Sequence, residues 1–215
     1  MNADDTAALA KEARRLVIAM CRATGQGYAG QGMELADILA CLYGTVLRPT
    51  SDGTCHDRLV LSTGHDAIAL FAILGALGVY DREELLTYGL DGSRIEESPL
   101  SGTPGFEITG GSLGQGLSQA LGMALAFRML GSDQRVVCVA SDGELQEGQV
   151  WEAMMAASHR RVDNLLLVVD NNDMQADGRT SDIMGVEPPR GSPARVRVVG
   201  SATRWSRHSR PACRI

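Results

Sequence analysis

Apolar residues recur at helical spacing from Thr6 to Cys21, which predicts an amphipathic helix near the start of the chain. The glycine-rich stretch TGQGYAGQGMEL follows and predicts a loop, and ADILACLYGTVL after it predicts a second helix. The next segment, DRLVLSTGHDAIALFAILGALG, predicts a strand, a tight turn and a helix. The first third of the chain is therefore predicted to contain two helices and a strand–turn–helix unit.

A second glycine-rich stretch, ITGGSLGQGLSQALGMA, predicts a loop that enters a helix of small residues. The backbone amides and the dipole at such a helix start favour an anion. The glycines equally suit a close-packed helix whose neighbours approach its backbone, and both interpretations hold together.

A strand–helix–strand unit follows. The β-branched run RVVCVA at 135–140 predicts a buried strand, and residues 147–161 predict a helix. The apolar run LLLVVD at 165–170 predicts a second strand. Strands that alternate with helices in this way indicate an α/β fold with a mainly parallel sheet and helices on both faces.

Polar residues follow both strands of this unit. Asp142 and Gly143 come after the first strand, and Asn172 comes after the second. The carboxyl ends of parallel strands share one edge of a sheet, so the two side-chain oxygens are expected to converge. A carboxylate and an amide oxygen suit Mg²⁺ with a substrate phosphate, and Gly143 allows that phosphate to approach the backbone. The alternative is an ordinary turn, since Asp-Gly and Asn-Asn are common turn formers.

The composition agrees with a globular intracellular protein. The chain has 215 residues, 44% of them hydrophobic, which suffices for a sizeable core. It has no apolar run of membrane-spanning length, and its first residues lack the pattern of a secretory signal, so the expected location is the cytoplasm. The five cysteines form no CxxC motif and are predicted to be buried free thiols.

The charge is unevenly distributed along the chain. Residues 1–188 carry a net charge of −13, whereas 189–215 hold seven Arg and no acidic residue. Such a tail is typical of disorder, and it also suits binding to nucleic acid or another anionic surface. We favour the plainer interpretation that the tail is a different kind of sequence from residues 1–188 and has no binding role. We therefore expect no nucleic-acid or membrane partner.

Two segments together resemble the thiamine diphosphate fingerprint of the transketolase family, namely SDGELQEGQVWEA and DNNDMQADG. The resemblance covers about residues 8–188 and implies the family's diphosphate-binding module, which is expected to be incomplete at its C-terminal end, with thiamine diphosphate and Mg²⁺ as cofactors. Residues 189–215 then form a divergent, disordered tail.

The resemblance also implies roles for individual residues. The residues implied to bind the cofactor are His65, Gly111, Ser112, Leu113, Asp142, Gly143, Glu144 and Asn172. Those implied to hold the metal are Asp142, Asn172 and, through its carbonyl, Met174. The residues implied in catalysis are His65 and Glu147.

Two of these assignments have plainer alternatives. A lone histidine such as His65 is more often an ordinary polar residue, although Ser62 and Gly64 beside it favour a functional turn. Glu147 equally suits a first-turn carboxylate that complements a helix dipole.

Two histidines of the family pattern are absent. Tyr28 stands where the first is usual, and Ser98 stands at the second. A tyrosine donates a hydrogen bond but does not shuttle a proton near neutral pH as imidazole does. The choice of donor substrate is therefore expected to differ.

The resemblance implies the N-terminal subunit of a split enzyme that transfers a two-carbon ketol unit from a ketose, such as a sugar phosphate, to an aldehyde. A C-terminal subunit would supply the pyrimidine-binding module, with active sites at the dimer interface of a heterotetramer. Two alternatives remain. One is a related thiamine diphosphate enzyme with an unusual acceptor in specialised metabolism, and the other is a non-catalytic truncated fragment.

Overall fold

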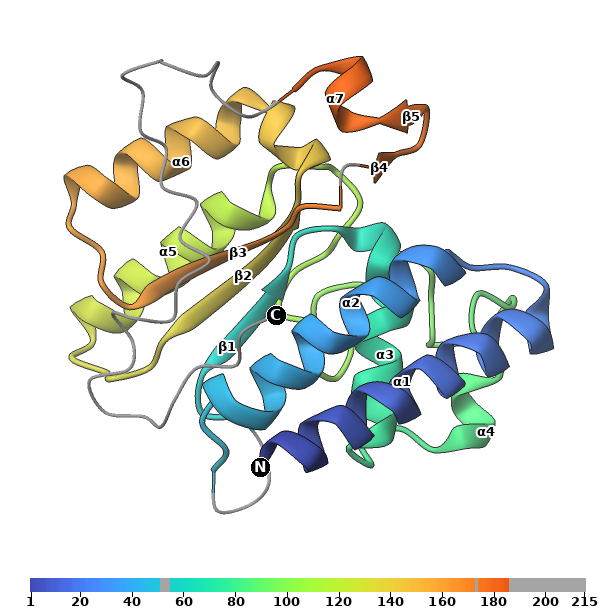
Figure 1. Cartoon of the computed structure of the whole chain (residues 1–215). Coiled ribbons are helices and arrows are strands. Elements are labelled where there is room, and N and C mark those ends of the chain that lie inside the picture. Colours follow the sequence, from blue (N-terminus) through green and yellow to red (C-terminus); the bar gives the residue numbers. More distant parts are fainter. Residues whose placement is uncertain (51–54, 173, 186–215) are drawn as a thin grey trace.

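The computed structural model describes residues 1–50, 55–172 and 174–185, and in this part a parallel sheet lies between two groups of helices (Figure 1). The sheet has the order β1-β2-β3, and both neighbouring pairs are parallel. Its strands are β1 (Arg58–Leu61), β2 (Val136–Ser141) and β3 (Leu165–Asp170). The predicted α/β fold, with a mainly parallel sheet and helices on both faces, is confirmed.

One helical layer is formed by α1 (Ala3–Thr24), α2 (Ala29–Cys41) and α3 (Ala67–Ala76), with a π-helical turn at Leu42–Val46 after α2. The helix α1 begins at a capping box, in which the side chains of Asn2 and Asp5 each accept a backbone N–H of the other residue. The sheet residues that pack against this layer are Leu59, Leu61, Val137 and Val139. They alternate along their strands with residues of the opposite face, as the two-residue period of a strand requires.

The opposite face of the sheet is covered by α5 (Gly116–Met129) and α6 (Gly148–His159) (Figure 1). Val60, Val136 and Cys138 pack against these helices in a second apolar cluster. Both layers cover the strands completely in the middle of the sheet, since Val60, Val137 and Cys138 have no exposed surface. This burial explains why β1 and β2 are continuous apolar runs in the sequence.

The remaining elements are short. They are a 3-10 turn at Gly64–Asp66, α4 (Arg82–Leu85), a second 3-10 turn at Gly143–Gln146, a hairpin of β4 (Met174–Gln175) and β5 (Gly178–Arg179), and α7 (Thr180–Ile183). The hairpin and α7 follow β3 and lie beyond the carboxyl end of the sheet (Figure 1).

The start of α2 differs from the sequence-based expectation. The glycine-rich stretch was expected to be a loop, but the helix begins inside it, at Ala29. The reason is packing, because a Cβ atom at Gly32 would lie 2.9 Å from side-chain atoms of Val17 and Ile68. Glycine at this position lets α2 lie close to α1 and α3, so here it serves helix contact rather than a turn.

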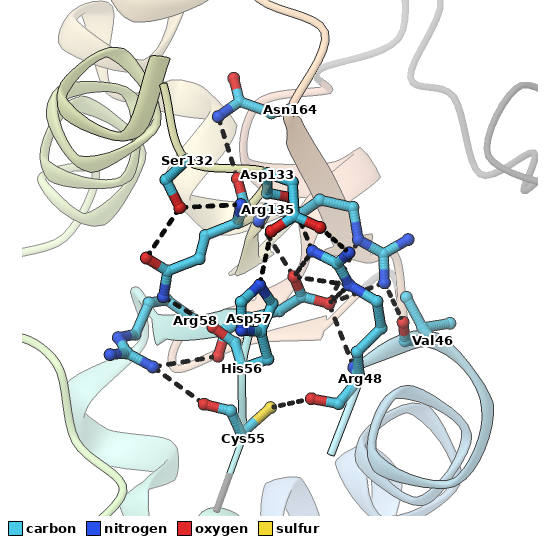
Figure 2. Close-up of polar contacts among 11 residues, drawn as sticks. Val46, Arg48, Cys55, His56, Asp57, Arg58, Ser132, Asp133, Arg135 and Asn164 are labelled. Carbon is cyan, nitrogen blue, oxygen red and sulfur yellow. Dashed lines mark hydrogen bonds and ion pairs between the residues drawn. The ribbon is translucent and has the colours of Figure 1, made fainter. Parts of the chain in front are cut away.

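A polar network fixes the amino ends of β1 and β2 (Figure 2). The buried carboxylate of Asp57 accepts hydrogen bonds from the side chains and the backbone N–H groups of both Arg48 and Arg135. Arg48 and His56 also contact Asp133. Burial alone would raise the pKa of Asp57, but its bonds to the two arginines hold that pKa well below the ordinary range.

Two further expectations concern cysteines and membranes. Cys21, Cys55 and Cys138 are free thiols, as predicted, but burial was predicted for all the cysteines, and of Cys21, Cys41, Cys55 and Cys138 only Cys138 is fully buried. Within the described ranges, no helix combines the length and the apolar character needed to cross a bilayer. Cys213 and the whole 189–215 segment lie outside the described residues, so the predicted division of the chain at residue 188 stays a prediction.

Candidate active site

The carboxyl ends of the three strands bring together polar residues from distant parts of the chain. The backbone N–H of Asp142, after β2, donates to the carbonyl oxygen of Asp170 at the end of β3 (2.9 Å). On the other side of β2, the hydroxyl of Ser62, after β1, donates to the carboxylate of Glu144 (2.6 Å). The three strand ends are thus tied into one continuous edge, opposite the Asp57 network.

Asp142 lies buried at the centre of this edge. Its Oδ1 accepts the N–H of Gly143 (2.9 Å), and its Oδ2 accepts the hydroxyl of Thr180 (2.8 Å). Thr180 is the first residue of α7, so the same carboxylate that is the predicted metal ligand also holds α7 against the sheet.

Asn172 lies two residues after β3, and each end of its side-chain amide is bonded. The nitrogen Nδ2 donates to Oε2 of Glu34 (2.9 Å) and to Oδ2 of Asp170 (3.2 Å). The oxygen Oδ1 accepts the N–H of Met174 (2.8 Å), the third predicted metal ligand. Burial, together with the charges of Glu34 and Asp66, raises the pKa of Asp170 to about 6.

The carboxylate of Glu144 is turned into the protein and has no exposed surface. Besides the hydroxyl of Ser62, it accepts the backbone N–H groups of Gly114 (2.7 Å) and Ser141 (3.2 Å). These bonds join the ends of β1 and β2 to the second glycine-rich loop. The predicted role of Glu144 in cofactor binding stays a prediction, and the side chain has a clear part in positioning that loop.

The second glycine-rich loop lies directly on the turn after β1. A Cβ atom at Gly64 would lie 2.4 Å from the backbone nitrogen of Gly111, so the two backbones touch in a way that any side chain would prevent. Gly111 itself has φ +123°, and no atom would lie within 4 Å of a Cβ there. The loop therefore presents bare backbone to open space, with Ser112 and Leu113 exposed beside it.

His65 is half-buried at the same turn. Its ring meets that of Tyr28 edge-on, with centroids 5.7 Å apart and an angle of 72° between the planes. Its Nε2 lies 3.5 Å from Oδ1 of Asp66, a buried oxygen without a hydrogen-bond partner among the described residues. Burial raises the pKa of Asp66, which disfavours its charged form at this edge.

Glu147 and Ser98 lie at the margin of the edge. Glu147 is exposed at the start of α6, where its side chain caps no backbone N–H, and its Cβ lies close to Gly114. Ser98 is exposed, and the carbonyl oxygen of its neighbour Pro99 accepts the N–H of Gly110 (3.4 Å). Both residues thus border the second glycine-rich loop, and the roles predicted for them stay predictions.

The structure adds three residues that the sequence did not single out as partners: Glu34, Ser62 and Thr180. Each bonds a predicted site residue from a remote part of the chain, over separations of 138, 82 and 38 residues. No local motif signals such pairings. Only Ser62, a polar residue directly after the apolar run of β1, indicated that a buried hydrogen bond was needed there.

The donors at this edge fit a hard divalent cation. Among the described residues, no group of three or more His, Cys, Asp and Glu side chains could hold a metal ion. A cation here would depend on the Asp142 carboxylate, the Asn172 amide oxygen, the Met174 carbonyl and phosphate oxygens of a ligand. Such an all-oxygen set, completed by phosphate, is the kind that Mg²⁺ prefers.

Comparison with known proteins identifies related chains. Residues 5–187 match the family model described as the transketolase, thiamine diphosphate binding domain. A transketolase family protein of Sinorhizobium fredii is 46% identical over 83% of this chain and 66% of its own length. A 6-deoxy-6-sulfo-D-fructose transketolase subunit of a Clostridium species is 39% identical over 81% of this chain and 65% of its own length.

Solved structures show the same relationship. Transketolase from Campylobacter jejuni aligns with 86% of this chain and 31% of its own length, with a TM-score of 0.77 and 31% sequence identity. The match thus spans about two thirds of the length of the two curated relatives and less than a third of this solved chain.

Proposed function

The chain belongs to the transketolase family and carries its thiamine diphosphate-binding domain, and from this premise we propose that it holds the diphosphate of that cofactor through Mg²⁺ at the carboxyl edge of the sheet. The proposed ligands of the cation are Asp142, Asn172 and the Met174 carbonyl. The bare backbone at Gly111 faces open space that the diphosphate can occupy, whereas a Cβ atom at Gly143 would already contact the Gln175 side chain at 3.7 Å.

One observation supports this proposal above the others. The bond from the Asp142 N–H to the Asp170 carbonyl sets the ends of β2 and β3 in register, so that the carboxylate and the Asn172 amide belong to adjacent strand ends. The open crevice outside the carboxyl ends of such strands is the usual ligand site of parallel α/β sheets.

The activity that we propose is transfer of a two-carbon ketol unit from a ketose donor to an aldehyde acceptor. When bound, thiamine diphosphate supplies an electron sink for cleavage of the donor. The chain's own contribution is to orient the cofactor, to offset diphosphate charge and to present His65 at the reacting side. Glu147 is proposed to join active sites across a dimer interface.

A partner chain is part of the proposal. The Clostridium relative is named a subunit of a transketolase, which supports a split enzyme in which a C-terminal subunit supplies the pyrimidine-binding module. We propose a heterotetramer in the cytoplasm, formed by two copies of each chain.

A second candidate is transfer from or to a less common substrate. Tyr28 contacts His65 at the position where a family histidine is usual, so the donor meets an aromatic ring and a phenol there. The Clostridium relative is named for 6-deoxy-6-sulfo-D-fructose, a modified sugar. Ketose donors with a modified end are therefore the substrates to compare with ordinary sugar phosphates.

Calorimetric titration tests the cofactor proposal. Thiamine diphosphate is titrated into the chain, alone and mixed with its partner subunit, with Mg²⁺ and then with EDTA. We expect saturable binding that requires the cation. Equal binding in EDTA would refute the metal-bridged site.

A further inference from the structure

Glu34 makes a contact that neither the family fingerprint nor the strand pattern accounts for. It lies on α2, in the first glycine-rich stretch, and its carboxylate accepts a hydrogen bond from Nδ2 of Asn172 (2.9 Å). The same nitrogen donates to Oδ2 of Asp170 (3.2 Å). The two hydrogens of one amide group thus face two carboxylates, one from α2 and one from β3.

This arrangement determines which way the Asn172 amide points. The two ends of an asparagine amide are nearly equal in size, so its orientation depends on its partners. An ionised carboxylate only accepts hydrogen bonds, so both Glu34 and Asp170 require the nitrogen on their side. The oxygen must then face the other way, where it accepts the N–H of Met174 (2.8 Å).

Keeping two carboxylates beside one amide has an electrostatic cost. Glu34 and Asp170 bond the same amide nitrogen, so their like charges lie close together and repel. An exposed glutamate on α2 could turn to solvent and avoid this repulsion, yet it bonds Asn172 instead. The bond to Asn172 is the gain that offsets the cost.

We propose that Glu34 is a positioning residue for Asn172, which keeps the amide oxygen directed to the cation that anchors the diphosphate. This inference rests on the proposed function. It assigns no metal contact to Glu34 itself. Partners that orient a metal ligand typically change metal affinity by about 10- to 100-fold when they are removed.

The helix α2 carries a second contact of the site, because Tyr28 precedes its first residue and touches His65. Glu34 therefore links the position of this helix to the metal side of the edge, and Tyr28 links it to the side of His65. A shift of α2 would disturb both contacts together.

The first test needs no cofactor. In ¹H–¹⁵N spectra of the chain, the two side-chain amide protons of Asn172 should be distinct and slow to exchange with water. In Glu34→Ala one acceptor is lost, so that exchange should accelerate by about tenfold or more, in line with the loss of a charge-assisted bond. Glu83→Gln, an exposed carboxylate on α4, is the matched control and should leave the Asn172 signals unchanged. Unaltered exchange in Glu34→Ala would overturn the inference.

The second test measures Mg²⁺ affinity at saturating thiamine diphosphate, with the partner subunit present. We expect about 10-fold weaker Mg²⁺ binding in Glu34→Ala. Glu34→Gln keeps an accepting oxygen and should recover most of the affinity. An equal loss in both variants would show that the negative charge itself binds the cation, and the positioning role would be wrong.

The two failures can be told apart. If the unmodified protein binds no thiamine diphosphate with Mg²⁺, the proposed function fails, whatever Glu34 does. If it binds and Glu34→Ala retains the full Mg²⁺ affinity, only the positioning role fails.

Discussion

The ring of Tyr28 meets the imidazole of His65 edge-on, with 5.7 Å between the two centroids. This contact places a half-exposed phenol beside a histidine that the family resemblance assigns to the cofactor and the reacting centre. Edge-to-face contacts of this kind hold both rings in preferred orientations. The side chain at position 28 therefore contacts His65 although it carries no imidazole itself.

Restoring the histidine should change donor preference. We expect Tyr28→His to raise transfer from xylulose 5-phosphate, because a positioned general acid or base contributes on the order of 10² to 10⁴ in rate. Ser98→His, made singly and with Tyr28→His, tests the second position. Rates with this donor and with a modified ketose are compared for the reconstituted enzyme.

Tyr28→Phe is the matched control for that comparison. It keeps the ring contact with His65 and removes only the hydroxyl, so donor preference should stay near that of the unmodified enzyme if the ring sets it. If the unmodified enzyme already uses xylulose 5-phosphate at ordinary rates and neither histidine adds anything, the altered-donor idea is wrong.

Replacing Asp142 by Ala should abolish Mg²⁺-dependent binding of thiamine diphosphate, because a ligand and its charge are lost together. Calorimetry measures the loss. The substitution also removes the bond to Thr180. Thr180→Ala serves as the control, since it breaks that bond and leaves the carboxylate in place. If Thr180→Ala weakens binding as much as Asp142→Ala, the effect comes from α7 and not from the metal.

The buried pair of Ser62 and Glu144 should stabilise the fold. Ser62→Ala leaves the fully buried carboxylate short of a donor, which costs about 1 to 3 kcal/mol. A double-mutant cycle with Glu144→Gln should give a coupling energy of about 0.5 to 3 kcal/mol in urea denaturation. Ser118→Ala, an exposed serine on α5, should have little effect. Additive losses from the two substitutions would show that the hydrogen bond contributes nothing of its own.

The Asp57 network should make the fold sensitive to acid. The pKa of Asp57 is held below its ordinary value of 3.8, so the charged carboxylate stabilises the folded state above about pH 4. That contribution is lost as the pH falls through the lowered folded-state pKa. Asp57→Asn should cost about 3 kcal/mol at neutral pH, at the low end for a broken buried pair because both arginines are partly exposed.

Urea denaturation of both proteins at pH 7 and at pH 3 provides the measurement. The difference between the unmodified protein and Asp57→Asn should shrink at the lower pH. Asp133→Asn is the control, since this exposed carboxylate also pairs with Arg48 but, being screened by solvent, should contribute little to stability. A difference that does not change with pH would contradict the assignment.

Local patterns predicted the sheet well. The strand expected at 165–170 is β3, and the helix expected at 147–161 is α6, because a continuous apolar run and a regular apolar spacing can both be recognised in a short window of sequence. The start of α2 was missed because its glycines serve contact with α1 and α3, a purpose that sequence alone does not distinguish from a turn.

The hydrogen bonds of the candidate site were less predictable than its residues. Shared strand ends brought Asp142 and Asn172 to one edge, as expected. Glu144 bonds Ser62 across 82 residues of sequence, and Glu34 bonds Asn172 across 138 residues. A short window of sequence contains no information about partners so far apart. Two-residue strands such as β4 and β5 are likewise too short to carry a period.

The strand order β1-β2-β3 also has a consequence for folding during synthesis on the ribosome. A ribosome releases α1, α2, β1 and α3 well before β2, yet Val137 and Val139 of β2 complete the apolar cluster beneath those helices. During synthesis the first helical layer is therefore left with an uncovered apolar underside until the middle of the chain emerges. Pairing of strands so distant in sequence is slow. Until β2 pairs, the exposed apolar side of the helical layer is the kind of surface that chaperones bind in nascent chains.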